Sequence, residues 1–159
     1  VIGNKCHAIN GFILLNDRDR VIIKRKKLKE PVSVELKIGC DYNFDNYVYK
    51  VSEYIKNVRF SNNSDEELID LAAIKNKKLV LRYWCSGDRF KPLGMNGTQK
   101  ISDYLINNKI NLFQKDEQTV LTADNQIIWV CGQRIDDTVK VNNSTKNILR
   151  IRRKLKRVE

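Results

Sequence analysis

The residues that could do chemistry gather in one glycine-rich stretch, residues 84–100. It reads WCSGDRFKPLGMNGTQK and carries three basic side chains, Arg89, Lys91 and Lys100. A strand-like alternation precedes it and a helical stripe follows it, so backbone amides and cationic side chains could converge on a phosphate group. The alternative is a tight connection whose glycines serve only backbone conformation. Both interpretations stay open at this point.

The stretch does not match a nucleotide-triphosphate loop. That motif needs GxxxxGK followed by Ser or Thr after a buried parallel strand. Here the spacing of Gly94, Gly97 and Lys100 is GxxGxxK, and Ile101 follows the lysine. The sequence therefore predicts no ATP binding by this stretch and favours a nucleic-acid phosphate as the ligand.

Other titratable residues give no support for catalysis. Asp136 and Asp137 are neighbours, and neighbours in an extended segment point to opposite faces, so we expect turn capping rather than a shared metal. His7 is the only histidine, which leaves no His-based triad. The four cysteines lie more than 30 residues apart without a CxxC pair, so no metal site is predicted and the thiols fit a reducing cytosol.

Arg89 and Arg134 are stronger candidates for binding, because both lie beside glycine-containing turns. A guanidinium fork suits a phosphate group or a guanine edge. The structural alternative is a salt bridge to a neighbouring carboxylate, Asp88 or Asp136. Three aromatic residues next to these segments could stack on bases, although core packing is favoured for them: Trp84, Phe90 and Trp129.

The basic charge of the chain is concentrated in two clusters. The net charge is +11, and residues 18–29 and 146–157 each hold seven basic residues, with one acid in the first cluster and none in the second. The remaining 16 basic and 18 acidic residues nearly cancel. This distribution is typical of a polyanion-binding face, which nucleic acid fits better than an acidic membrane. Solvated charge at the chain ends is the alternative.

The alternation of apolar residues predicts an α+β fold of short antiparallel strands and hairpins with one main helix. Hairpins are expected over 12–23 and 119–131, and strands over 32–38, 47–51 and 79–84. The main helix is expected over 101–108, with Thr98 as its N-cap. The C-terminal residues fit strand and helix spacing, and we favour a strand to about Arg152.

The polar stretch 57–67 is the candidate boundary or mobile loop. We expect a β-rich accessory segment or small linker domain over residues 1–67 and a second domain over 68–159. No apolar run approaches the roughly 18 residues that span a bilayer. Because the chain starts at Val1 and Met95 is its only methionine, we expect it to be an excised fragment.

The second half of the chain resembles the C-terminal domain of the tRNA(Ile)-lysidine synthetase family. The family pattern is roughly RxWxxGDRFxPxGMxG, then KxxSDFF, then IxWVVGxRIDD. The matching segments are Arg82, Trp84, GDRF at 87–90, Pro92, GMNG at 94–97, KISDYL at 100–105, IWVCGQRIDD at 128–137 and TKNILRI at 145–151. The match covers about residues 68–152, and the departures from it are Tyr104-Leu105 for the usual aromatic pair and Cys131 for a common Val.

The resemblance implies a bacterial, cytoplasmic tRNA-modifying ligase that uses ATP, with magnesium, and lysine to convert the wobble cytidine of tRNA(Ile) to lysidine. In the family an N-terminal domain with an SGGxDS-type loop does this chemistry. The chain has no such loop, so we expect no catalytic residue, cofactor or metal in it, and a docking role for the tRNA body or acceptor stem. The expected RNA contacts are Arg89, Lys91, Lys100, Arg134, Lys146, Arg150 and Arg152.

The expected partners are tRNA(Ile) and the parent protein's own N-terminal catalytic domain, with no membrane, and homo-oligomerisation stays open. A different class of function also stays open. The chain could be a structural or dimerising module whose basic charge is incidental.

Overall fold

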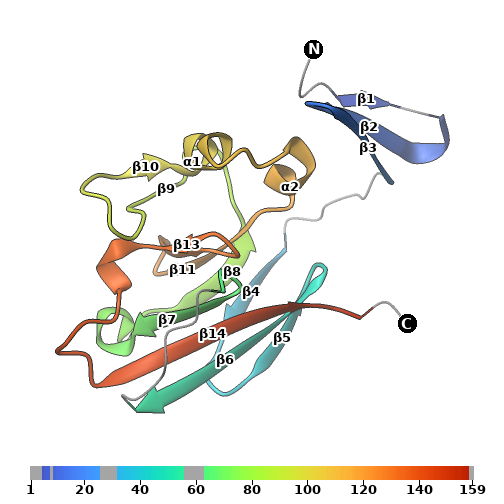
Figure 1. Cartoon of the computed structure of the whole chain (residues 1–159). Coiled ribbons are helices and arrows are strands. Elements are labelled where there is room, and N and C mark those ends of the chain that lie inside the picture. Colours follow the sequence, from blue (N-terminus) through green and yellow to red (C-terminus); the bar gives the residue numbers. More distant parts are fainter. Residues whose placement is uncertain (1–4, 8, 26–31, 56–62, 158–159) are drawn as a thin grey trace.

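The computed structural model describes residues 5–7, 9–25, 32–55 and 63–157, which form layers of antiparallel sheet (Figure 1). One sheet has four strands in the order β5-β6-β14-β7, and a second has five in the order β13-β12-β11-β8-β4. Their bounds are β4 Ser33–Leu36, β5 Asp41–Phe44, β6 Tyr47–Ile55, β7 Glu66–Asp70, β8 Leu79–Tyr83, β11 Thr119–Ala123, β12 Gln126–Val130, β13 Arg134–Ile135 and β14 Asn147–Leu155.

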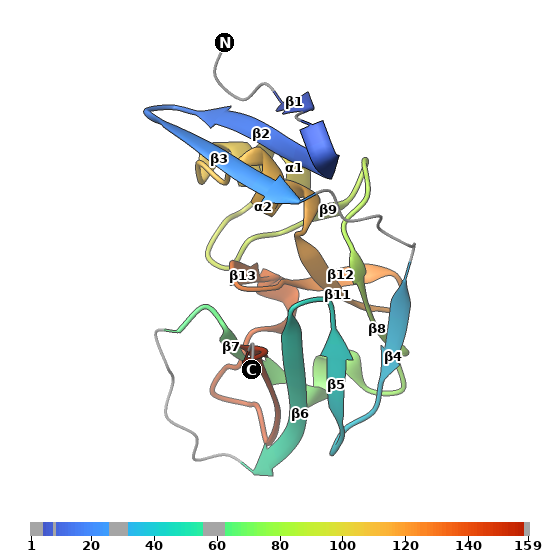
Figure 2. The ribbon, with the colours of Figure 1, turned by 90° about the vertical axis from the view of Figure 1, so that its right-hand side faces the viewer.

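Shorter elements cover one side of this pair of sheets (Figure 2). The helices α1 (Ile101–Asn107) and α2 (Leu112–Asp116) lie there with the two-stranded ribbon of β9 (Arg89–Phe90) and β10 (Gln99–Lys100). A third sheet lies next to α2 and holds β1 (Lys5–His7), β2 (Phe12–Asp17) and β3 (Arg20–Arg25). The single-turn helices are η1 (Ile9–Gly11), η2 (Leu71–Ile74) and η3 (Asp137–Val139).

The main core lies between the four-stranded and five-stranded sheets. Trp129 of β12 and Tyr49 of β6 are both fully buried there and meet edge to face, with ring centroids 6.3 Å apart. The Tyr49 hydroxyl group shares a 2.8 Å hydrogen bond with Thr119 Oγ1, so this buried polar group is satisfied. Burial also raises the pKa of Tyr49 well above its ordinary value. Alternating apolar residues on the facing strands therefore form a conventional sandwich interior.

A second core lies on the other face of the five-stranded sheet. Val120 and Val130 of that sheet pack against Ile101 and Leu105 of α1, and all four are buried. Phe90 of β9 joins them through an edge-to-face contact with Tyr104 at 5.1 Å. Strands β11 and β12 are consequently buried on both faces, and they read as nearly continuous apolar runs.

The described residues contain the hairpins and antiparallel strands that the sequence predicts. They are strand-dominated, because the helices have only seven and five residues, and this description fits better than α+β with one main helix. The N-cap of α1 is Lys100 and not Thr98, so that prediction was wrong. The C-terminal strand was predicted correctly, and it extends beyond Arg152 to Leu155.

Both large sheets combine strands from the two halves of the chain. β4 pairs with β8 through Val34 opposite Leu81, and β6 pairs with β14 along nine residue pairs. The expected boundary loop, 57–67, falls partly outside the described residues, and its last two residues begin β7. Sheet pairing therefore connects residues 33–55 tightly to the segment that follows residue 66.

The tail of β14 is fixed by Arg153, which lies across Gly132. Its guanidinium group donates to Asp65 and stacks over the Tyr47 ring at 4.3 Å, and its side chain is only 14% exposed. A Cβ atom on Gly132 would lie 1.6 Å from Arg153 Nη2, and the φ angle there is +74°. Gly132 is thus required both for its left-handed backbone and for the space that Arg153 occupies.

Replacing Gly132 with alanine should therefore destabilise the fold. We expect Gly132→Ala to lower the free energy of unfolding by about 1–3 kcal/mol, since it adds backbone strain and displaces an anchored guanidinium group. Urea unfolding followed by circular dichroism measures the loss. Gly97→Ala is the matched control, because a methyl group at Gly97 would meet nothing within 4 Å beyond its chain neighbours. Equal stability of the two variants would contradict this role for Gly132.

Candidate nucleic-acid interface

The first turn of the glycine-rich stretch is held by Asp88. Its carboxylate accepts two hydrogen bonds from Arg82, at 2.8 and 3.0 Å, and one from the Cys85 amide at 2.7 Å. Asp88 is the turn residue that the sequence predicts. Its ion-pair partner is Arg82 of β8 and not the adjacent Arg89, so Arg89 is left free of this carboxylate.

Asp136 and Asp137 fasten the rest of the stretch to the sheet. The buried Asp136 carboxylate accepts from the Lys91 amide at 2.7 Å and from the Thr138 amide at 2.9 Å. Asp137 accepts from the Gly94 amide at 3.0 Å and pairs with Lys91 and Lys140. The Gly94 amide and these cations lower the pKa of Asp137 to about 2. Turn capping, as predicted, is confirmed for Asp136, which is the N-cap of η3, whereas Asp137 holds the distant Gly94 amide.

This arrangement changes the phosphate interpretation of the glycine-rich stretch. The Gly94 amide is occupied by Asp137, and the Lys91 ammonium group lies 3.3 Å from the same carboxylate. Gly87 and Gly94 have φ angles of +94° and +84°, which explains why glycine is needed at both positions. Gly87 and Gly94 thus serve the conformation of this loop, and the exposed cationic side chains remain as the candidate phosphate contacts.

Three cations at this end of the molecule have no carboxylate partner within the described residues. Arg89 and Lys100 are exposed and lie directly opposite each other in the β9–β10 ribbon. Like charges in opposite positions repel each other, so this placement costs stability unless an anion binds between them. Arg134 of β13 is also exposed, and its Nε donates to the Leu93 carbonyl at 3.3 Å. The structural alternative of an Arg134–Asp136 ion pair is not what the described residues show.

Strand β14 carries the second group of predicted cations, and they divide in the same way. Arg150 pairs with Glu66 at 2.8 Å and lies over the Tyr54 ring, so its charge is engaged. Arg152 lies between Lys50 of β6 and Glu66 of β7 in the strand register, and it forms no ion pair with a carboxylate in the described part of the chain, because Glu66 pairs with Arg150. Lys146 is exposed in the turn before β14 and is likewise unpaired there.

The aromatic residues near these cations belong to the interior, as expected. Trp129 is fully buried and Phe90 is 3% exposed, so neither can stack on a base. Trp84 is half-buried, and its Nε1 donates to the Lys115 carbonyl at 2.6 Å. Packing, not base stacking, therefore accounts for these three positions.

Sequence patterns did not identify Glu67, the most unusual carboxylate of the structure. It lies on β7 opposite Ile151, which turns it toward the inner face of the sheet. Burial raises the pKa of Glu67 to about 7, and the Arg134 guanidinium group opposes that rise. The only signal in the sequence is the alternation of Glu67 with Leu68 and Ile69, which does not reveal which face is buried.

Two further observations concern membrane helices and metal sites. No helix among the described residues is long and apolar enough to cross a membrane. The same residues contain no group of three or more His, Cys, Asp or Glu side chains that could hold a metal ion.

Comparisons with known proteins match one family. Residues 79–156 match the family described as TilS substrate C-terminal domain. A tRNA(Ile)-lysidine synthase of Clostridium perfringens is 31% identical over 164 residues, covering 94% of this chain and 34% of that protein. The corresponding enzyme of Bacteroides thetaiotaomicron is 30% identical over 149 residues, covering 93% and 34%. The chain thus spans about a third of the length of these relatives.

A solved structure shares the fold. It is described as the crystal structure of a TILS C-terminal domain, and it superposes with a TM-score of 0.71 at 21% sequence identity. The superposition covers 81% of this chain and all of that one. The agreement supports the sheet arrangement described above.

The raised pKa of Glu67 predicts a pH-dependent stability. In the unfolded chain this carboxyl group titrates near 4.5, so between pH 4.5 and 7 the folded state binds more protons than the unfolded state. Stability should therefore fall as the pH rises through this window. Between pH 5 and pH 8, Glu67→Gln should gain about 1–3 kcal/mol in unfolding free energy relative to the wild type.

Denaturant unfolding at both pH values measures this difference. Glu53→Gln is the control, because Glu53 is an exposed carboxylate on the same sheet and should give no comparable gain. If the free energy of unfolding of Glu67→Gln differs from that of the wild type by the same amount at both pH values, the burial of an ionising carboxyl group is contradicted.

Proposed function

The chain belongs to the TilS C-terminal domain family, matched over residues 79–156, and from this premise we propose that it is the tRNA-docking C-terminal region of a tRNA(Ile)-lysidine synthase. The observation that carries the proposal is the set of cations without carboxylate partners in the described residues. The domain holds Arg82, Lys91, Arg150 and Arg153 in ion pairs but leaves others exposed. Such unpaired cations suit the phosphates of a tRNA.

We assign the RNA contacts according to these partners. The leading contacts are Arg89, Lys100 and Arg134 at the glycine-rich end and Lys146 and Arg152 on or beside β14. Lys91 and Arg150 have positioning roles, because their charges already meet Asp137 and Glu66. The tRNA body or acceptor stem is the element that we expect to lie on these residues.

The chemistry is assigned to the remainder of the parent protein. There, ATP with magnesium and lysine would convert the wobble cytidine of tRNA(Ile) to lysidine, and the present chain would hold the tRNA without catalysing the reaction. The relatives named above are about three times as long as the region that this chain matches. Its partners would be tRNA(Ile) and the N-terminal catalytic domain, in the cytoplasm.

One observation favours a second function, that of an association module. Val21 and Ile23 of β3 are 61% and 62% exposed, and they lie on the same face of the β1–β3 sheet. An apolar face of this kind can bind another protein surface. Sedimentation at several concentrations in high salt distinguishes the two functions, because apolar self-association persists in salt whereas RNA binding does not.

The tRNA-docking proposal predicts binding that depends steeply on salt. The logarithm of the association constant for tRNA(Ile) should fall with the logarithm of salt concentration by roughly 0.7–0.9 per phosphate contact. The double variant Arg89→Ala/Lys100→Ala should weaken binding and reduce this slope by about 1.4–1.8, since it removes two phosphate contacts. Filter binding between low and moderate salt measures both quantities.

Lys78→Ala is the matched control, because Lys78 is exposed but paired with Glu35 at 2.9 Å. Its effect on slope and affinity should be small. The proposal fails if the wild-type chain shows no binding at low salt, or if the double variant and the control behave alike.

A further inference from the structure

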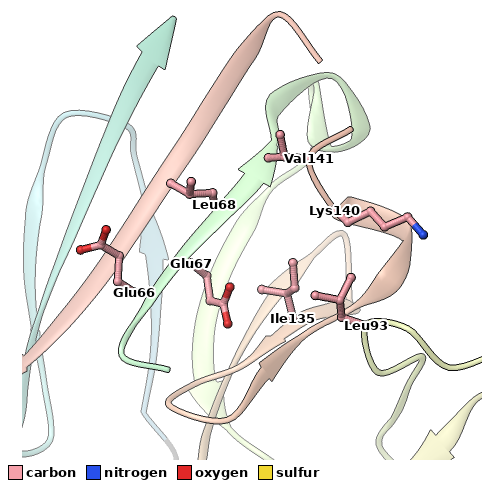
Figure 3. A pocket seen from close by; sticks show the side chains of 7 residues that line it. All are labelled: Glu66, Glu67, Leu68, Leu93, Ile135, Lys140 and Val141. Carbon is pink, nitrogen blue, oxygen red and sulfur yellow. The ribbon is translucent and has the colours of Figure 1, made fainter. Parts of the chain in front are cut away.

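A small cavity opens beside Glu67, between the edge of the four-stranded sheet and the segment after β13 (Figure 3). Its volume is about 140 Å³. It is lined by Glu66, Glu67 and Leu68 of β7 and by Leu93, Ile135, Lys140 and Val141. The Glu67 carboxylate faces Ile135 and Leu93, and the Lys140 ammonium group points away from it. Of the two carboxylates that line the cavity, Glu67 therefore faces its apolar wall.

The backbone fixes this geometry from three sides. Glu67 lies directly opposite Ile151, which is fully buried, so its side chain has to point inward. An isolated bridge between Ile69 and Lys140 brings the segment after η3 against β7. The Leu93 amide donates to the Ile135 carbonyl at 3.0 Å, which keeps the other wall in place. The cavity is therefore part of the fold and not a gap between loose loops.

The other charged groups around the cavity are already paired. Glu66 on β7 is bound to Arg150, and Lys140 is bound to Asp137. Glu67 has no hydrogen bond or ion pair with any described residue; Arg134 and the Tyr104 hydroxyl group interact with it only through their electrostatic fields. A half-buried carboxylate that accepts no hydrogen bond costs free energy of folding. A ligand with N–H groups would supply the missing donors.

We propose, on the basis of the tRNA-docking function above, that this cavity binds an unstacked guanine of the RNA through the two oxygens of Glu67. Guanine presents N1–H and N2–H side by side on one edge, and two parallel donors match the two oxygens of a carboxylate. The flat ring would lie against Leu93, Ile135 and Val141. A cavity of about 150 Å³ can hold an aromatic ring such as benzene, so the donor-bearing ring fits while the rest of the base reaches the opening.

The surroundings distinguish guanine from other ligands. An organic cation would be repelled by the Arg134 guanidinium group, whose field reaches Glu67, whereas a neutral base would not. Adenine and cytosine place an acceptor nitrogen beside their amino group, and uracil flanks its single N–H with two carbonyl groups, so each repels an ionised carboxylate. Arg134, whose charge acts on Glu67, can meanwhile contact the phosphate of the same nucleotide.

The test uses the full 159-residue chain and free nucleotides. We expect GMP to produce saturable NMR shifts of the Leu93 and Ile135 methyl groups, and IMP, which lacks the N2 amino group, to bind at least about fivefold more weakly. GMP affinity should rise between pH 6 and pH 8 as the carboxyl group ionises, and Glu67→Gln should abolish both the preference over IMP and the pH dependence. Equal binding of GMP and IMP, or no shift of these methyl groups, overturns the inference.

A parallel measurement with tRNA(Ile) separates this inference from the proposed function. If the wild type binds tRNA with a salt dependence, but Glu67→Gln binds equally well and GMP gives no shift, the guanine site is wrong and tRNA docking stands. If the wild type does not bind tRNA at low salt, the docking function fails, and the inference about RNA fails with it. The Arg89→Ala/Lys100→Ala variant serves as the control, because it should weaken tRNA binding and leave the preference for GMP over IMP unchanged.

Discussion

The candidate interface depends on one interaction, the attachment of the glycine-rich stretch to the sheet by Asp136 and Asp137. The Asp136 carboxylate accepts hydrogen bonds from the Lys91 and Thr138 amides, and the Asp137 carboxylate accepts one from the Gly94 amide. A bond of the Asp137 amide to the Lys91 carbonyl at 2.7 Å completes the connection. Because a carboxylate that accepts backbone N–H groups is stabilised in its charged form, these contacts are strong without an added ligand. They make the position of the β9–β10 ribbon, and so of Arg89 and Lys100, a property of the fold.

The same reasoning separates two kinds of basic residue. A cation beside a half-buried carboxylate, such as Arg82 with Asp88 or Arg153 with Asp65, contributes to the fold and has no charge to spare for a ligand. A cation opposite another cation, such as Arg89 opposite Lys100, costs the fold a little and is relieved by a bound anion. The net charge of +11 therefore overstates the number of basic residues that are available to bind an anion. Anion binding depends instead on which cations the pairing of the strands leaves without a carboxylate partner.

Local sequence predicted local structure well and long-range pairing poorly. Alternation predicted the strands β2, β3, β4, β6, β8, β11, β12 and β14, and it did not predict β5, β7, β9, β10 or β13. The capping role of Asp136 in its own turn was also predicted, because it depends on a few adjacent residues. The helix α2 was not predicted, because Leu112–Asp116 is too short for a periodic pattern. Nor did the sequence show that Arg150 would meet Glu66, or that Arg153 would lie across Gly132. Those contacts depend on the register of β14 between β6 and β7, which no local pattern encodes.

The position of Glu67 within a basic interface follows from the division of labour in nucleic-acid recognition. Phosphate contacts supply affinity and orientation but carry no sequence information, so cations alone cannot distinguish one tRNA from another. Base edges are read by hydrogen-bonding groups with a fixed direction, and a fixed direction needs a side chain held by packing. Glu67 is held in this way by its place opposite Ile151, whereas exposed Arg89 and Lys100 are not. A carboxylate that burial keeps partly protonated near pH 7 also repels an approaching polyanion less than an exposed one would. A selective contact would accordingly lie at the cavity, with the unpaired cations around it bringing the RNA into place.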